Sequence, residues 1–144
     1  MSPEHDHEHA PDGGRADAPE DGRATAHYLC IGCPLGCRLE VDAVDGEVVE
    51  VRGHSCKRGK EFAVQEYTDP RRFVTTTVRV EGGRRARLPV KTAASVPKDR
   101  VADVAQALHQ LTVTAPVSMG DVVLADVLGT GVDVVATRDL PRAA

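Results

Sequence analysis

The sequence predicts an α+β protein built from two parts. All four cysteines fall between positions 30 and 56 of the 144-residue chain, alternating apolar and polar residues predict several short strands, and one stretch repeats its apolar residues at helical spacing. We therefore expect a small N-terminal cysteine-rich metal-binding β-hairpin module, followed by a mixed, mainly β lobe with one amphipathic helix. Aromatic residues make up only 3% of the chain, so the core must be built from small aliphatic side chains.

Residues 1–27 are predicted to be a disordered acidic tail. They carry seven acids against two arginines and almost no large apolar side chains, so they cannot bury enough surface to offset the entropy lost on ordering. His5, His7 and His9 alternate with acids in this tail. Such a tract can bind metal weakly, but we favour a solvated tail.

Residues 28–69 are predicted to form the cysteine module. Residues 39–43 alternate strictly between apolar and polar, which is typical of a half-buried strand. Asp45-Gly46 has the composition of a two-residue hairpin turn, and residues 47–52 would form the returning strand. A short helix over residues 60–67 is expected to follow the hairpin.

This hairpin accounts for the long gap before the last cysteine. If Val44 and Glu47 flank the turn, Cys37 lies opposite His54. Cys56 then sits two residues beyond that point. The hairpin is therefore expected to bring the fourth thiol back to the first three.

Residues 70–140 are predicted to form the α+β lobe. Strands are expected at residues 75–80 and 85–92, the second at a sheet edge because Pro89 lacks an N–H for the ladder. Residues 95–99 have the composition of a helix start, and residues 121–128 and 132–137 predict two more strands. The apolar face of the helix is predicted to consist of Val101, Val104, Ala105 and Leu108.

The spacing of the cysteines favours an iron–sulfur cluster. Four thiols suit either zinc or a cluster, but structural zinc usually takes two Cys-x2-Cys pairs, and this chain has one. Three ligands in one loop and a distant fourth suit a [4Fe–4S] cluster. Zinc stays the alternative, and a redox-active dithiol ranks below both because Pro34 and Gly36 follow the pair where a helix would be expected. The proposed ligands are Cys30, Cys33, Cys37 and Cys56.

Basic residues lie beside both ends of this motif. Four thiolates around a cluster leave a negative site, which nearby cations or N–H groups must offset. Solvated surface charges are the simpler explanation, yet their position favours a role at the site. The candidates for charge compensation are Arg38, Lys57 and Arg58, with Lys60 close by, and His54 is expected beside the ligands or in solvent.

Two resemblances extend this interpretation. The run CIGCPLGCRLEVDAVDGEVVEVRGHSCKRG resembles the N-terminal segment of molybdopterin oxidoreductases, in which four cysteines bind one [4Fe–4S] cluster. That resemblance would give Cys30, Cys33, Cys37 and Cys56 this role and would place Lys57 between cluster and pterin. Because the loop before the last cysteine is shorter here, no molybdenum cofactor is implied.

The ordered chain as a whole is more similar to a family of small prokaryotic proteins, domain of unknown function 1667. The stretches that carry this similarity have the patterns CxxCPxGCxL, CxRGxxFAxxE, PRRxxTTTVxV and LPVKTxxxxPK. The resemblance implies association with FAD-dependent dehydrogenases of the glycerol-3-phosphate or NAD(FAD) type. It implies an accessory subunit of an oxidoreductase rather than an enzyme that acts alone.

Other classes of function are less well supported. Without the tail the chain is nearly neutral and lacks a basic stripe with interleaved aromatics, so no nucleic-acid partner is expected. The polar N-terminus and the lack of a long apolar run predict a cytoplasmic protein without membrane insertion. No nucleophile–base pair stands out in the sequence, so no catalytic residue is predicted. We therefore expect an iron–sulfur electron-transfer subunit, with a zinc-stabilised adaptor that has no redox role as the alternative.

Overall fold

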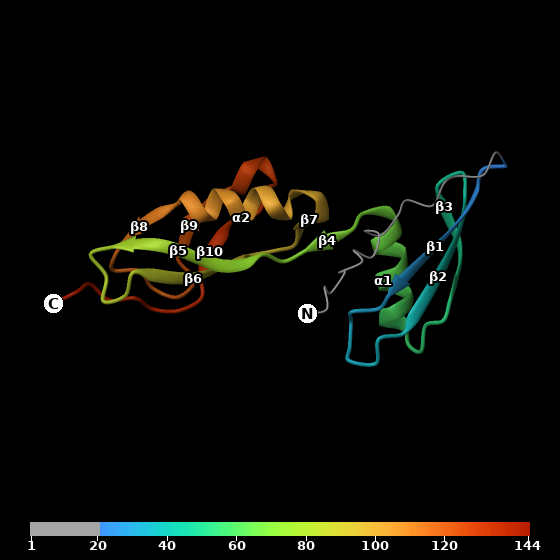
Figure 1. Ribbon diagram of the computed structural model, residues 1–144, viewed down its shortest axis with the longest axis horizontal. Coiled ribbons are helices and arrows are strands. Elements are labelled where there is room, and N and C mark those ends of the chain that lie inside the picture. Colours follow the sequence, from blue (N-terminus) through green and yellow to red (C-terminus); the bar gives the residue numbers. More distant parts are fainter. Residues whose placement is uncertain (1–20) are drawn as a thin grey trace, which may run out of the picture. The chain divides into compact units, whose positions relative to one another are not determined.

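The computed structural model describes residues 21–144, and the acidic histidine tract at residues 5–9 lies outside this range. The described chain divides into two compact units, the first ending at Thr68 and the second beginning at Asp69. Both units contain sheet and helix (Figure 1). The protein is α+β, as predicted.

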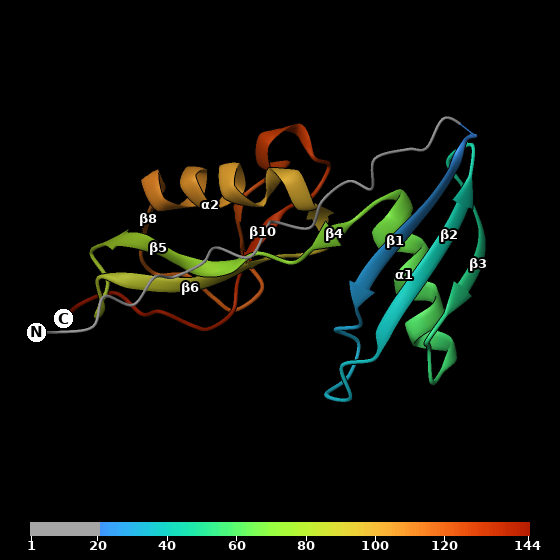
Figure 2. The ribbon, with the colours of Figure 1, turned by 45° about the vertical axis from the view of Figure 1, so that its right-hand side comes forward.

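The first unit is an antiparallel sheet of three strands in the order β1-β2-β3. The helix α1 packs on this sheet, in contact with β2 and β3 (Figure 2). Its first turn is formed by Lys57, Arg58 and Gly59, so the helix begins three residues earlier than predicted. The elements are β1 (Arg23–Leu29), β2 (Arg38–Val44), β3 (Glu47–Arg52) and α1 (Lys57–Thr68).

Strand β1 corrects the predicted extent of the disordered tail. Residues 23–27 are not disordered but pair with β2, from Arg23 opposite Val44 to Leu29 opposite Arg38. The composition of these residues is poor in large apolar groups, yet every second residue of β1 is partly buried. The strand is held by its ladder with β2 and by Tyr28, which packs against the core of the unit, a source of order that composition does not report.

The hairpin β2–β3 has the predicted turn but a different register. Asp45 and Gly46 both have positive φ, 51° and 85°, as a type I′ turn requires. A bulge then shifts the pairing, so that Asp42 lies opposite Glu50. This register, continued to the base of the hairpin, sets Cys37 beside Ser55 rather than His54. The predicted pairing with His54 is wrong because one extra residue, Val49, is accommodated in β3.

The core of the first unit is small. Five buried residues form it, namely Cys30, Leu39, Val41, Val51 and Ala63, with partly buried side chains such as Cys37 and Phe62 packed against them. Two of the four cysteines thus belong to this cluster. The thiols lie where the sheet, the loop and the start of α1 meet.

The second unit is a sheet of five strands in the order β8-β5-β6-β10-β9. All pairs are antiparallel except β5 with β8, which is parallel. The strands β4 and β7 form a separate, two-stranded antiparallel sheet. The elements are β4 (Arg71–Arg72), β5 (Thr75–Glu81), β6 (Arg87–Thr92), β7 (Val96–Pro97), η1 (Lys98–Arg100), α2 (Val101–Gln110), β8 (Thr112–Thr114), β9 (Val122–Leu124), η2 (Val127–Gly129) and β10 (Val134–Ala136).

The helix α2 covers one face of this sheet (Figures 1 and 2). Val104 and Leu108 are fully buried, and Val101 and Ala105 pack against the same cluster. The predicted apolar face is therefore confirmed. Fifteen buried residues form the core of this unit, and all of them are valine, leucine or alanine.

Pro89 does not mark an edge strand. Strand β6 lies inside the sheet, between β5 and β10. The ladder with β10 covers only Val90 to Thr92, and beyond it the Pro89 carbonyl accepts the Thr137 N–H at 3.0 Å. The ring nitrogen thus falls where β10 has already ended, which is how a proline is tolerated in a central strand.

Candidate metal site

The loop between β1 and β2 carries three of the cysteines. The Cys30 N–H donates to the Cys37 carbonyl at 2.8 Å, so this bond closes the base of the loop. Gly36, with φ +62°, supplies the left-handed turn just before Cys37. Cys33 lies between these two ends and is partly exposed. The loop therefore holds Cys30 and Cys37 as neighbours and presents Cys33 from its middle.

Gly53 allows the end of β3 to approach this loop. Its φ is +83°, and a Cβ built there would lie 2.0 Å from the Arg38 carbonyl oxygen. No other residue type fits such a position without displacing the backbone. The segment that follows can then run close to β2, where the Cys37 sulfur and the Ser55 hydroxyl are 3.2 Å apart.

Cys56 caps the N-terminus of α1. Its carbonyl accepts the Lys60 N–H at 3.3 Å, the first helical hydrogen bond. The Gly59 N–H, and to a smaller extent the Arg58 N–H and guanidinium, hold the pKa of the exposed Cys56 thiol below its usual range. The unpaired N–H groups of a helix start stabilise a thiolate in this way.

Gly59 connects this capping thiol with the buried one. A Cβ built on Gly59 would lie 3.8 Å from the Cys30 sulfur and 3.4 Å from the His54 Cβ. The backbone of Gly59 therefore faces Cys30, while the Gly59 N–H donates to Cys56. A side chain at this position would contact His54 and the Cys30 sulfur.

Three of the four thiols have contacts around the start of α1, but the four do not form a ligand set. All four are free. Cys37 contacts Ser55, next to Cys56, and both Cys30 and Cys56 lie beside Gly59. Within residues 21–144, no three histidine, cysteine or acidic side chains already form a group that could hold a metal ion.

The donor chemistry fits a thiophilic centre. Four soft thiolates suit a cluster or zinc.

The predicted charge-compensating residues differ in their interaction partners. The Arg58 side chain hydrogen-bonds Cys56 and its positive charge favours the thiolate. Lys57 instead pairs with Glu61, at 3.5 Å along the helix. Arg38 and His54 are exposed, and the His54 Cβ lies beside Gly59.

Three residues of this arrangement were not foreseen in the sequence. Gly53 and Gly59 shape the approach of the backbone, and Ser55 contacts Cys37. The Gly-containing stretches around Cys56 are the only signal that could have pointed to them, since glycine often marks close approach of a backbone.

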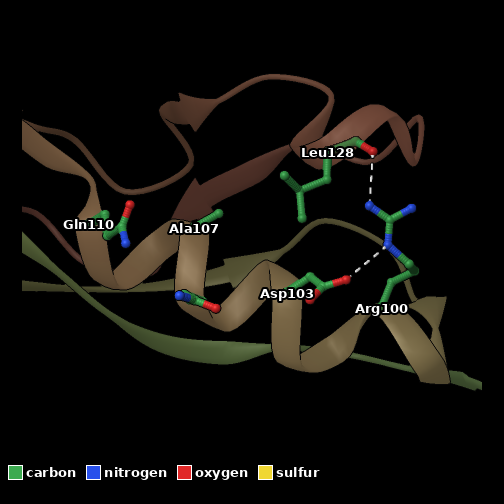
Figure 3. Close-up of a pocket in the computed structure, with 6 residues that line it drawn as sticks. Arg100, Asp103, Ala107, Gln110 and Leu128 are labelled. Carbon is green, nitrogen blue, oxygen red and sulfur yellow. Dashed lines mark hydrogen bonds and ion pairs between the residues drawn. The ribbon is translucent and has the colours of Figure 1, made fainter.

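A shallow depression in the second unit offers no comparable chemistry. It has a volume of about 300 Å³ and lies beside α2 (Figure 3). Arg100 is occupied there, because its guanidinium pairs with Asp103 at 3.5 Å and donates to the Leu128 carbonyl at 3.4 Å. We assign no catalytic role to these side chains.

Comparison with known proteins identifies the family. Residues 57–138 match the family described as Protein of unknown function (DUF1667), and the chain belongs to it. The matched range begins directly after Cys56, so it includes α1 and most of the second unit but none of the four cysteines. The similarity to molybdopterin oxidoreductases stays a prediction.

One solved structure is similar to part of the chain. The NMR structure of Clostridium perfringens protein CPE0013 is 31% identical, covers 51% of this chain and 88% of that protein, and has a TM-score of 0.48. No curated protein matches. Among the described residues, neither α1 nor α2 has the length and apolar character that crossing a bilayer demands.

Proposed function

We propose that residues 21–68 form a thiolate site for a [4Fe–4S] cluster and that the protein is an electron-transfer subunit of an oxidoreductase. The observation that carries this proposal is the meeting of the cysteine loop with the N-terminus of α1. Cys30 faces Gly59, the Gly59 N–H donates to Cys56, and Cys37 contacts Ser55. Such a cluster, when bound, accepts and releases single electrons.

The charge at the start of α1 supports a negative centre at this point. The first turn holds Lys57, Arg58 and Lys60 and no acid. Cations are unfavourable at the positive end of a helix dipole, where acids are normally preferred. A group of thiolates with a net negative charge would turn this unfavourable arrangement into a favourable one.

The protein's own residues would have three tasks. Cys30, buried in the core of the unit, would anchor the centre rigidly. Cys56 would be held as a thiolate by the helix N–H groups. The exposed loop around Cys33 would close over the centre while staying near the surface, where a partner can approach.

The partner that we propose is an FAD-dependent dehydrogenase of the glycerol-3-phosphate or NAD(FAD) type. This choice rests on the family resemblance. Electrons would pass between its flavin and the cluster and then to a further acceptor. A reducing compartment such as the cytoplasm would keep the four thiols free for the metal.

Metal analysis after anaerobic purification tests the proposal. We expect a brown protein with about four iron atoms and about four acid-labile sulfides per chain. Reversible bleaching on reduction, followed by absorbance and electron paramagnetic resonance, would establish that the centre carries electrons. A colourless protein with one zinc ion per chain would refute the electron-transfer function and support the adaptor.

A matched pair of variants tests the ligand set. Cys56→Ser removes a proposed ligand, and we expect the iron content to fall well below four per chain. Ser55→Ala removes the hydroxyl that contacts Cys37 but no proposed ligand, so the iron content should stay at the wild-type value. An unchanged iron content in Cys56→Ser would show that the hairpin does not deliver a ligand.

A further inference from the structure

The turn between β5 and β6 meets the C-terminal segment in a basic pocket. The Arg84 N–H donates to the Pro141 carbonyl at 3.2 Å, and the Ala143 N–H donates to the Gly82 carbonyl at 2.8 Å. These bonds fix the two segments against each other. The pocket between them has a volume of about 450 Å³ and is lined by Arg84, Arg85, Arg138, Asp139, Leu140 and Pro141.

The three arginines of this pocket have unused donors. Within residues 21–144, the guanidinium groups of Arg84, Arg85 and Arg138 make neither an ion pair nor a hydrogen bond. Other arginines of the same unit are occupied: Arg87 donates to the Thr77 hydroxyl at 2.6 Å and to its carbonyl at 2.9 Å, and Arg100 pairs with Asp103.

The single acid in the lining does not balance these charges. One oxygen of the Asp139 carboxylate accepts the Met119 N–H at 2.7 Å. Three arginines against one aspartate leave the pocket with a net charge of +2. Like charges gathered in one pocket repel each other, so an anion with two negative charges would relieve the repulsion.

We propose that this pocket binds the phosphate group of a small molecule. A guanidinium presents paired N–H donors that match phosphate oxygens in a bidentate geometry, and a phosphate monoester carries close to two negative charges at neutral pH. The pocket volume lies in the range of small-molecule sites. Pro141 adds an apolar surface for an organic part of the ligand.

The site is independent of the proposed metal centre. All three arginines belong to the second unit and lie within the range that matches the family. Phosphate binding can therefore be tested on the full-length protein whatever metal it holds, and its failure would leave the metal proposal untouched.

Titration of the full-length protein at 0.15 M salt, followed by NMR and calorimetry, tests the proposal. We expect inorganic phosphate and pyrophosphate to bind, with shifts centred on residues 82–85 and 138–141. A second arm uses vesicles that contain phosphatidic acid. Binding to the vesicles without binding of free phosphate would show that the phosphate belongs to a lipid headgroup. No binding in either arm would overturn the proposal.

Single variants separate a built site from general surface charge. Arg84→Gln, Arg85→Gln and Arg138→Gln should each weaken pyrophosphate binding by about tenfold, as the loss of a charge-assisted hydrogen bond does. The control is Arg79→Gln, which removes an exposed arginine of β5 that does not line the pocket. If this control weakened binding as much as the three lining variants, or if the lining variants bound normally, the proposal would be wrong.

Discussion

The two units of this protein differ in the size of their apolar cores. The second unit has fifteen buried residues in its cluster, whereas the first has five, and one of those five is Cys30. Small cores give little net stability, and small domains often add metal or disulfide links to compensate. A metal bound at the proposed thiol site would therefore add to the stability of the first unit as well as supply its chemistry.

The same comparison explains why the cysteines lie where they do. Cys30 and Cys37 are packed into or against the core of the first unit, so a centre bound there would continue the core instead of hanging from the surface. The second unit needs no such link, because its sheet and α2 enclose aliphatic side chains on their own. Each of the following predictions tests this contrast.

Removal of the metal that we propose should have the largest effect, and the effect should be confined to the first unit. Structural metal sites contribute about 10 kcal/mol or more to folding, which exceeds what a core of five buried residues can replace. After chelation, NMR amide signals of residues 21–68 should lose their dispersion while those of residues 69–144 keep theirs. Equal loss in both units would contradict the contrast.

Leu108→Ala should destabilise the second unit by about 2–5 kcal/mol, since it removes a fully buried side chain and leaves a cavity. Denaturant unfolding followed by α2 signals measures this loss. The control, Val122→Ala, truncates a side chain that is 53% exposed and should change stability by less than about 0.5 kcal/mol. Metal content should be unaffected by either change.

Gly53→Ala should destabilise the first unit by more than about 1 kcal/mol, because its positive φ is strained for alanine and the added methyl group meets the Arg38 carbonyl. Gly46→Ala is the matched control, since φ is +85° there but nothing lies within 4 Å of the new Cβ. Thermal unfolding of the two variants should therefore differ, and similar losses would show that the close approach at Gly53 is unimportant.

The smallest effect is expected from the ion cluster on the exposed face of the hairpin. Hydrogen bonds from Arg52, and then from Thr25, hold the pKa of the Asp42 carboxyl below its usual range. Because this pKa is lowered by folding, its contribution to stability is present above the usual aspartate pKa of about 3.9 and is lost as the pH falls through the lowered value.

Arg52→Gln should raise the pKa of Asp42 towards its usual value. An NMR titration of the side-chain carboxyl carbon measures this change. Thr25→Val, which removes the weaker hydrogen bond, should raise it less. An unchanged pKa in Arg52→Gln would mean that this pair does not persist in solution.

The sequence was most informative where a pattern is local. The apolar spacing around Val104 and Leu108 predicted the buried face of α2, and Asp45-Gly46 predicted the hairpin turn. Both depend on residues a few positions apart, so the chain itself carries the signal. The spacing of the cysteines also predicts a shared metal site, and that stays a prediction.

What the sequence could not supply depends on pairing between distant segments. Strand β1 was missed because its small side chains look like part of the tail, and only the ladder with β2 reveals it. The bulge at Val49 leaves no mark among similar apolar residues. Pro89 was placed at an edge because the early end of β10 cannot be read from β6.

The bulge in β3 has a consequence for how relatives of this protein can vary. The position of Cys56 in space is set by the base of the hairpin, where Cys37 contacts Ser55. The number of residues between Cys37 and Cys56 does not set it. Two residues added at the tip, one to each strand, would lengthen the ribbon and leave that base untouched. A single residue added to β3 alone would turn the sulfur of Cys56 away, unless a second irregularity absorbed it.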